Sequence, residues 1–188
     1  MLQDEVKKAV EVLKNGGVIL YPTDTIWGIG CDATNPEAVK KVYEIKHRED
    51  SKALISLVDS EARITRYVRN VADVTWDMIE LSEKPLTVIF DGVTGLASNV
   101  IAEDGSAAIR VTREEFSKEL CYRFQKPIVS TSANISGEPT AQTFDAISDD
   151  IKNAVDYVVR YNQRCKEKHK PSSIIKIGAN GLFTIIRE

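Results

Sequence analysis

The 188-residue sequence has few of the residues that build metal sites or disulfide scaffolds. Its three cysteines, Cys31, Cys121 and Cys165, lie far apart and form no CxxC pair. This pattern excludes a disulfide framework or a zinc ribbon, and it favours a reducing compartment with cysteines as plain packing residues. There are two histidines, His47 and His169, which are too few for a histidine-based metal centre. We therefore expect no metal ion held by protein ligands alone.

Long apolar runs are also missing. No stretch of about 18 consecutive apolar residues occurs, and the N-terminal sequence MLQDEVKKAV lacks the apolar segment of a signal peptide. These absences predict a cytoplasmic protein without a membrane partner. The net charge is −3, from 25 basic and 28 acidic residues, which argues against broad electrostatic binding of nucleic acid.

Several common catalytic motifs are absent as well. There is no GxxxxGK[ST], so the chain is not a P-loop enzyme, and no GxGxxG follows an apolar run. A GxSxG nucleophile elbow is lacking too, which argues against a Ser-His-Asp hydrolase. The carboxylates are scattered and form no evident catalytic pair. Any chemistry must therefore rest on cations, hydroxyls and backbone groups.

What the sequence does contain is an alternation of amphipathic helical segments and short apolar runs. Helical spacing of apolar residues predicts helices over 2–13, 36–45, 60–68, 71–81, 113–124 and 144–151. Apolar runs predict strands over 18–21, 53–58, 86–90, 107–111, 127–129, 154–159, 173–177 and 182–186. The last two strands are joined by Gly178-Ala179-Asn180-Gly181, a sequence typical of a hairpin turn. The pattern predicts one α/β domain over residues 1–188 with a mixed sheet.

The predicted core is formed by apolar residues of these strands. They are Ile19, Leu54, Ile55, Val88, Ile109, Ile128 and Val129.

Two polar stretches follow predicted strands. The first, 126–139 (KPIVSTSANISGEP), predicts a buried strand that delivers small polar side chains to the rim of the sheet, namely Ser130, Thr131, Ser132 and Asn134. The second, Pro22-Thr23-Asp24-Thr25, ends the first strand, because Pro22 cannot donate to a ladder and the hydroxyls then protrude. Gly28 and Gly30 let the backbone pass close to another strand or to a ligand. By itself, the first stretch fits an ordinary hydroxyl-rich loop equally well.

A cationic cluster, Lys46, Arg48 and Lys52, lies between a predicted helix end and a buried strand. Lysine supplies a point charge and arginine a planar fork, and together they suit a phosphate or a carboxylate. Glu49 and Asp50 would partly neutralise this patch. Taken alone, a solvated helix C-terminus is the better interpretation, because the helix dipole favours basic residues there.

In combination, five motifs resemble the YrdC-like family of threonylcarbamoyl-AMP synthases. They are YPTDTIWGIGCD at 21–32, KHR at 46–48, IRVT at 109–112, STSANISG at 130–137 and PSSI at 171–174. Their order and spacing are kept over almost the whole chain, which resembles the short, single-domain form of the family. The resemblance implies a twisted open α/β sheet with one concave, positively charged cavity.

The resemblance implies a nucleotidyltransferase that joins L-threonine, bicarbonate and ATP into threonylcarbamoyl-adenylate and pyrophosphate. The adenylate then feeds a separate transferase complex that modifies the adenosine beside the anticodon of certain transfer RNAs, with at most a weak direct contact to tRNA. Such a reaction needs positioning and charge neutralisation more than a histidine base. We expect Mg²⁺ to be held mainly through the ATP phosphates.

The resemblance also implies roles for particular residues. The catalytic tetrad, which also binds ATP, falls on Lys46, Arg48, Ser132 and Asn134. Threonine binding falls on Thr25, Arg110 and Ser130. Further ATP contacts fall on Lys52, Thr140 and Ser173. From this assignment we expect that removing Lys46 or Arg48 spares stability and abolishes turnover.

The sequence departs from the family pattern at several positions. Glu49 and Ala53 replace prolines, Ser82-Glu83-Lys84-Pro85 replaces Trp-Pro-Gly, and the usually glycine-rich segment 162–170 is basic. We interpret 162–170 as an exposed, mobile loop rather than a lid. Two other functions are alternatives to the synthase: an RNA-binding module without catalysis, and a relative that handles carbamoyl-adenylate in hydrogenase maturation. The latter is usually a domain of a longer chain that carries zinc-finger cysteines, which this chain lacks.

Overall fold

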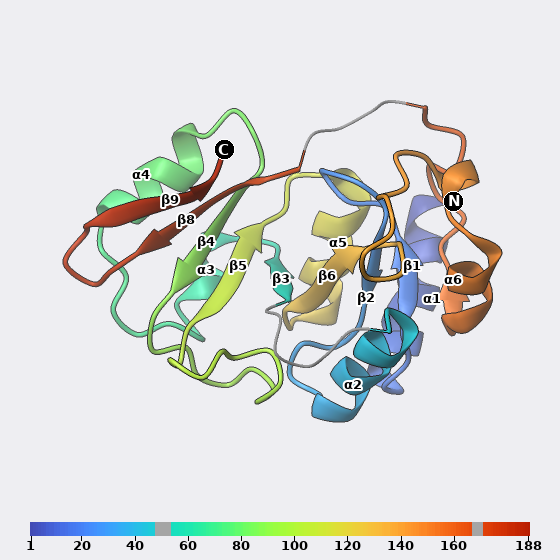
Figure 1. Ribbon diagram of the computed structural model, residues 1–188, viewed down its shortest axis with the longest axis horizontal. Coiled ribbons are helices and arrows are strands. Elements are labelled where there is room, and N and C mark those ends of the chain that lie inside the picture. Colours follow the sequence, from blue (N-terminus) through green and yellow to red (C-terminus); the bar gives the residue numbers. More distant parts are fainter. Residues whose placement is uncertain (48–53, 167–170) are drawn as a thin grey trace.

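The computed structural model describes residues 1–47, 54–166 and 171–188 (Figure 1). Within them, one sheet has the strand order β7-β1-β2-β6-β3-β5-β4-β8-β9. The strands are β1 (Ile19–Tyr21), β2 (Gly28–Gly30), β3 (Ile55–Val58), β4 (Leu86–Phe90), β5 (Ala107–Val111), β6 (Ile128–Ser132), β7 (Tyr157–Val158), β8 (Ser173–Ile177) and β9 (Phe183–Arg187). The helices are α1 (Leu2–Lys14), α2 (Pro36–Ile45), α3 (Glu61–Ile64), α4 (Val74–Leu81), α5 (Glu115–Phe124), α6 (Asp149–Ala154) and the 3₁₀ turn η1 (Phe144–Ala146).

The sheet is mixed, as the sequence predicts. The pairs β1–β7, β3–β5 and β4–β8 are parallel, and the remaining neighbours are antiparallel. Helices α1 and α5 pack on each other, and α5 and α3 both contact β3. In Figure 1, α5 lies behind the strands, while α4 accompanies the C-terminal hairpin at the opposite end of the sheet from α1. The described helices are too short or too polar to cross a bilayer.

The best-predicted helices have clear sequence signals at both ends. Helix α1 buries Val6, Ala9, Val10 and Leu13, the residues that define its apolar stripe. Helix α2 starts as predicted, since Asn35 Oδ1 accepts hydrogen bonds from Glu37 N–H (3.0 Å) and Ala38 N–H (3.2 Å). Its last residue is Ile45, which makes Lys46 the C-cap.

Strand β2 is absent from the predicted set, because two of its three residues are glycine and strand propensity there is low. The structure explains those glycines. A Cβ on Gly30 would lie 2.4 Å from the Val129 carbonyl oxygen and 2.6 Å from the Tyr21 ring. Of the two alternatives, close approach to a strand therefore holds at Gly30, which is squeezed between β1 and β6.

Six of the seven predicted core residues are buried, and Ile55 is the exception. Ile55 is half-buried because it borders a cavity described below. The predicted helices over 60–68 and 71–81 are shorter in the structure, as α3 and α4. Val68 instead forms an isolated bridge with Val93. The predicted strand over 154–159 shrinks to β7, since α6 extends to Ala154.

Candidate active site

A cavity of about 460 Å³ opens where the loop after β1, the end of β6 and the C-terminal hairpin meet. Five predicted site residues line it: Thr25, Arg110, Ser130, Ser132 and Thr140. Its other walls come from β2, β3, β4, β5, the segment before β8 and the end of β9. The structure thus gathers side chains from positions 25 to 187 of the chain into one site.

The pairing of β6 explains how its hydroxyls reach the cavity. Ser132 faces Gly28 on β2, and Ser130 faces Ile55 on β3. A Cβ on Gly28 would lie 3.2 Å from Ser130 Oγ, so glycine leaves room for that hydroxyl. Of the four small polar residues predicted at the rim of the sheet, Ser130, Thr131 and Ser132 lie in β6 and line the cavity.

Arg110 is a buried cation in the wall of this cavity, with its side chain 3% exposed. Its Nη2 lies 2.9 Å from Asp24 Oδ1, on the loop after β1. This contact is an ion pair without hydrogen-bond geometry, and Arg110 Nε has no hydrogen-bond partner among the described residues. A buried donor without a partner is costly, so the site is suited to an anion that accepts from Arg110.

Lys46 is almost fully buried, with 2% of its surface exposed. Its Nζ donates to the carbonyl oxygens of Ser132 (2.5 Å) and Asn134 (2.7 Å). Its own carbonyl accepts from Ser136 N–H at 2.9 Å. Lys46 therefore fastens the end of α2 to the segment that follows β6, and three members of the predicted tetrad are brought together through the backbone.

Asn134 shapes the same segment. Its Nδ2 donates to the carbonyls of Ile135 (3.0 Å) and Glu138 (2.7 Å), which closes the turn after β6. Lys46 and Asn134 are not among the residues that line the cavity. The predicted sites Arg48 and Lys52 lie outside the described residues.

Ser173 is placed differently from the prediction. It borders a separate hollow beside α4 with Met78 and Leu81, whereas Ser172 lines the cavity. Consecutive side chains point to opposite sides of an extended strand, so a shift of one residue exchanges the faces. Of these two serines, Ser172 therefore lines the cavity, and the predicted ATP contact of Ser173 stays a prediction. The Ser172 Oγ lies 2.9 Å from the hydroxyl of Thr87.

Arg187, at the end of β9, is a cavity residue that the sequence analysis missed. Its Nε and Nη2 donate to the Ser172 carbonyl at 3.0 and 2.7 Å. Burial and the positive charge of Arg110 lower the pKa of Arg187 from its usual value. A lone basic residue at a strand end carries no motif, so only the topology shows that it faces the same cavity as Arg110.

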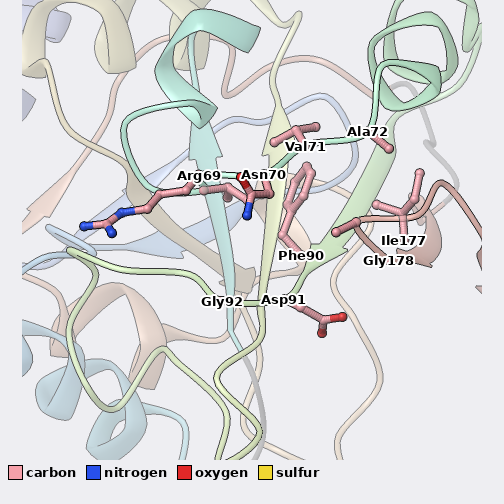
Figure 2. A pocket seen from close by; sticks show the side chains of 11 residues that line it. Arg69, Asn70, Val71, Ala72, Phe90, Asp91, Gly92, Ile177 and Gly178 are labelled. Atoms are coloured by element: carbon pink, nitrogen blue, oxygen red, sulfur yellow. The ribbon is translucent and has the colours of Figure 1, made fainter.

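A second hollow, of about 300 Å³, lies at the C-terminal end of β4, between residues 68–72 and the turn after β8. Figure 2 shows its Arg69 and Asp91 side chains diverging, with Phe90 and Val71 between them. Asp91 is already paired with Lys176 at 3.1 Å. Because its charged groups do not converge, this hollow is a weaker candidate than the cavity around Arg110.

Metal and thiol chemistry find little support in the described part of the chain. It holds no group of three or more His, Cys, Asp or Glu side chains suited to a metal ion. Burial raises the pKa of the Cys31 and Cys121 thiols far above their usual value, so both are unreactive packing residues.

Comparison with known proteins identifies the family of this chain. The Sua5/YciO/YrdC family model, described as "Telomere recombination", matches residues 11–188. A protein of Methanocaldococcus jannaschii is 37% identical over 97% of this chain and 87% of its own length. The threonylcarbamoyl-AMP synthase of Vibrio campbellii is 30% identical over 89% of this chain and 91% of its own. That of Pseudoalteromonas translucida is 31% identical over 84% and 86%.

Solved structures show the same fold. Escherichia coli YciO matches with a TM-score of 0.84 at 22% identity, over 99% of this chain and 89% of that one. Pyrococcus abyssi Sua5, solved in complex with L-threonine, matches with a TM-score of 0.81 at 20% identity. This chain is covered to 92% in that match and spans half of the P. abyssi chain. The predicted resemblance is confirmed: the chain belongs to the Sua5/YciO/YrdC family.

Proposed function

We propose that this chain is a threonylcarbamoyl-AMP synthase, a nucleotidyltransferase that forms threonylcarbamoyl-adenylate and pyrophosphate from L-threonine, bicarbonate and ATP. The observation that carries the proposal is that two arginines, Arg110 and Arg187, line one cavity together with several hydroxyls. The names of the curated relatives support it, at 30 and 31% identity over most of both chains.

The amino-acid half of the site is assigned to Thr25, Arg110 and Ser130. The unpaired Nε–H of buried Arg110 is suited to donate to the substrate carboxylate, since charge-assisted hydrogen bonds to a carboxylate are strong. Thr25 and Ser130 offer hydroxyls in the lining of the same cavity. P. abyssi Sua5, whose structure holds L-threonine, shares this fold.

The nucleotide half is assigned to Ser132, Thr140, Ser172 and Arg187, which line the same cavity. Arg48 and Lys52 complete this half in the proposal as phosphate ligands. Lys46 and Asn134 do not line the cavity; they hold the segment at the end of β6 and after it in place by donating hydrogen bonds to its carbonyl oxygens. This division places the carboxylate of threonine and the phosphates of ATP at different arginines.

The reaction needs alignment rather than a strong base. An oxygen of the threonine carbamate attacks the α-phosphorus of ATP, the bond from that phosphorus to the bridging oxygen breaks, and pyrophosphate leaves. Fixed cations and hydroxyls lower the barrier by holding the two reactants in line and by stabilising charge on the departing oxygens. Arg187, Arg48 and Lys52 are placed in the proposal to supply that charge.

Magnesium fits this site as an ion carried by the nucleotide. The described residues that line the cavity offer hydroxyl oxygens, such as those of Ser132 and Thr140, and no carboxylate. Mg²⁺ usually keeps several waters and binds through substrate phosphates, so such a lining suits it. When bound, the ion would neutralise phosphate charge.

The proposed product is a reactive adenylate, which a transferase that modifies the adenosine beside the tRNA anticodon would consume. Because ATP and transfer RNA are cytoplasmic, we place the reaction in the cytoplasm. Residues 1–188 form one domain in this proposal. No observed feature of the cavity favours an RNA-binding module over the enzyme.

The proposal is tested by measuring pyrophosphate release from the whole chain with Mg²⁺-ATP. We expect release to require both L-threonine and bicarbonate, and Lys46→Met to reduce kcat/KM by about 100-fold or more, since the segment after β6 loses its anchor. The matched control is Lys41→Met, whose Nζ also donates to a carbonyl, that of Gly16, but on the surface. Release that ignores threonine, or no release at all, would refute the synthase.

The structure changes one expectation for this experiment. The sequence predicts that Lys46 can be removed without loss of stability. Removing this buried ammonium leaves the Asn134 carbonyl without its donor, at a cost of about 1–3 kcal/mol, while the Ser132 carbonyl keeps the hydrogen bond from Asn134 N–H at 2.9 Å. We therefore expect Lys46→Met to lower the melting temperature as well, and kinetics must be measured well below it.

A further inference from the structure

The turn Thr23-Asp24-Thr25 contains a short hydrogen-bond chain that ends at the cavity. Thr23 Oγ donates to the Ile26 carbonyl at 2.6 Å. It accepts from Thr25 N–H at 3.2 Å and lies 3.1 Å from Thr25 Oγ. Both threonines are 7% exposed, and of the two only Thr25 lines the cavity.

The direction of the contact between the two hydroxyls follows from counting protons. A hydroxyl has one hydrogen to donate, and the Thr23 hydrogen is committed to the Ile26 carbonyl. Thr23 can therefore only accept in its contact with Thr25, so the hydrogen between them belongs to Thr25. As a result Thr25 presents lone pairs, and no O–H, to the cavity.

The amino-acid half of the site then has two ends of opposite polarity. Arg110 can only donate, because a guanidinium has no acceptor. Thr25, with its hydrogen held by Thr23, can only accept. A ligand that matches both ends carries an anionic acceptor at one end and a hydrogen-bond donor at the other.

We propose that Thr23 is a specificity-determining residue which, by holding the hydroxyl hydrogen of Thr25, makes Thr25 an acceptor for a donor group of the amino-acid substrate. This inference rests on the proposed function and deepens it. The donor is either the β-hydroxyl or the amino group of L-threonine, and both present a hydrogen to a fixed acceptor. A buried acceptor left without its donor is costly, so analogues that lack that hydrogen are rejected.

Two substitutions at Thr23 separate polarity from packing. Thr23→Val keeps the shape and removes the hydroxyl, which releases the Thr25 hydrogen to compete with the substrate donor. Thr23→Ser removes the methyl group and keeps the hydroxyl. We expect Thr23→Val to weaken L-threonine binding about tenfold or more, and Thr23→Ser to bind within about threefold of the parent chain. The KM for ATP should stay unchanged in both variants.

Thr112→Val is the matched control for the loss of a buried threonine hydroxyl. Thr112 is fully buried and its Oγ lies 2.7 Å from the Ser117 hydroxyl, at the start of α5 and outside the cavity lining. We expect this variant to lose stability and to keep its affinity for L-threonine. A general loss of stability is thereby separated from a change in the site.

Binding is measured by calorimetry with L-threonine and with L-valine, which has the same shape and amino group without the hydroxyl. If the donor is the hydroxyl, Thr23→Val weakens the binding of L-threonine more than that of L-valine, so the ratio of the two dissociation constants moves closer to one. If the donor is the amino group, both ligands weaken by the same factor. Unchanged L-threonine affinity in Thr23→Val, or equal losses in Thr23→Val and Thr23→Ser, would overturn the inference.

Turnover measured in parallel keeps this result distinct from the proposed function. A parent chain that binds L-threonine without releasing pyrophosphate would refute the synthase and leave the binding comparison intact. A parent chain that binds neither amino acid would overturn both.

Discussion

Charged side chains that do not reach the cavity still control the groups that do. Asp24 borders a small hollow that Val111 and Arg113 also line, and its carboxylate is the ion-pair partner of Arg110. The loop after β1 and strand β5 are separated by three strands in the sheet order, so this pair spans the site. Asp24 is therefore a positioning residue for Arg110.

We predict that Asp24→Asn raises the KM for L-threonine at least tenfold and leaves the KM for ATP within about twofold, because the substrate carboxylate loses a correctly held guanidinium. Asp59→Asn is the control. Asp59 pairs with Arg63 at the same 2.9 Å, with side chains 10% and 6% exposed, away from the cavity. Breaking either buried pair should cost on the order of 3 kcal/mol of stability. Equal kinetic effects at both sites would contradict a positioning role.

At single residues, the sequence predicts the site where a motif is long and fails where one position decides. From the motif STSANISG at 130–137, Ser130, Thr131 and Ser132 line the cavity, whereas Asn134 lies outside its lining. In PSSI at 171–174, two adjacent serines are equivalent as letters, and only strand register shows that Ser172 faces the cavity. Arg187 has no local signal, because its function depends on β9 pairing beside β8.

At the scale of elements, composition predicts some strands to the residue and misses others. Strands β4, β5 and β8 match their apolar runs, since each is bounded by turn residues or polar residues. Strand β2 is not predicted from an apolar run, because close packing against Val129 and Tyr21 requires glycine, which carries no strand signal. The missed strand contains Gly28, which lines the cavity. Local strand propensity therefore fails as a predictor next to the site.

Glu5 links two elements, α1 and β7. Its Oε2 accepts from Tyr157 O–H and from Arg160 N–H, both at 2.7 Å. Burial opposes ionisation of Glu5, but these hydrogen bonds outweigh it, and the pKa of the carboxyl is lowered from its usual value. A carboxyl whose pKa is lower in the folded state contributes stability that is present above the unfolded pKa and lost as the pH falls through the folded pKa.

We predict that Glu5→Gln destabilises the protein at pH 7, and that the difference in free energy of unfolding from the parent chain shrinks as the pH falls below about 4.5. Urea unfolding at several pH values measures it. Glu11→Gln, at an exposed position on the same helix, serves as the control. Its free energy of unfolding should equal that of the parent chain at each pH. A difference that stays constant down to pH 3 would show that the hydrogen bonds to Glu5 do not depend on its charge.

At the scale of the whole molecule, the cavity draws on both ends of one sheet. Thr25 and Gly28 come from the β1–β2 side, and Ser172 and Arg187 come from the β8–β9 side, while β6 lies between them. One apolar core includes residues of β1, β2, β6 and β8, whereas β9 is exposed. Catalysis in the proposed function therefore requires both sides to be folded at once, which favours a single cooperative unit.

We predict that residues 1–188 unfold in one two-state transition, with equal calorimetric and van't Hoff enthalpies of about 130 kcal/mol near 60 °C. The two tryptophans report on the two sides: Trp27 lines the cavity beside β2, and Trp76 lies on α4 next to the C-terminal hairpin. Trp76→Phe and Trp27→Phe leave one tryptophan reporter each. Urea unfolding followed by fluorescence should show one transition, described by a single m-value, in both variants. Within each variant, the fluorescence midpoint should coincide with that from far-ultraviolet circular dichroism. If the Trp76 reporter lost its signal before the circular dichroism changed, the C-terminal hairpin and α4 would form a separate unit, and the cavity would open before the rest of the sheet unfolds.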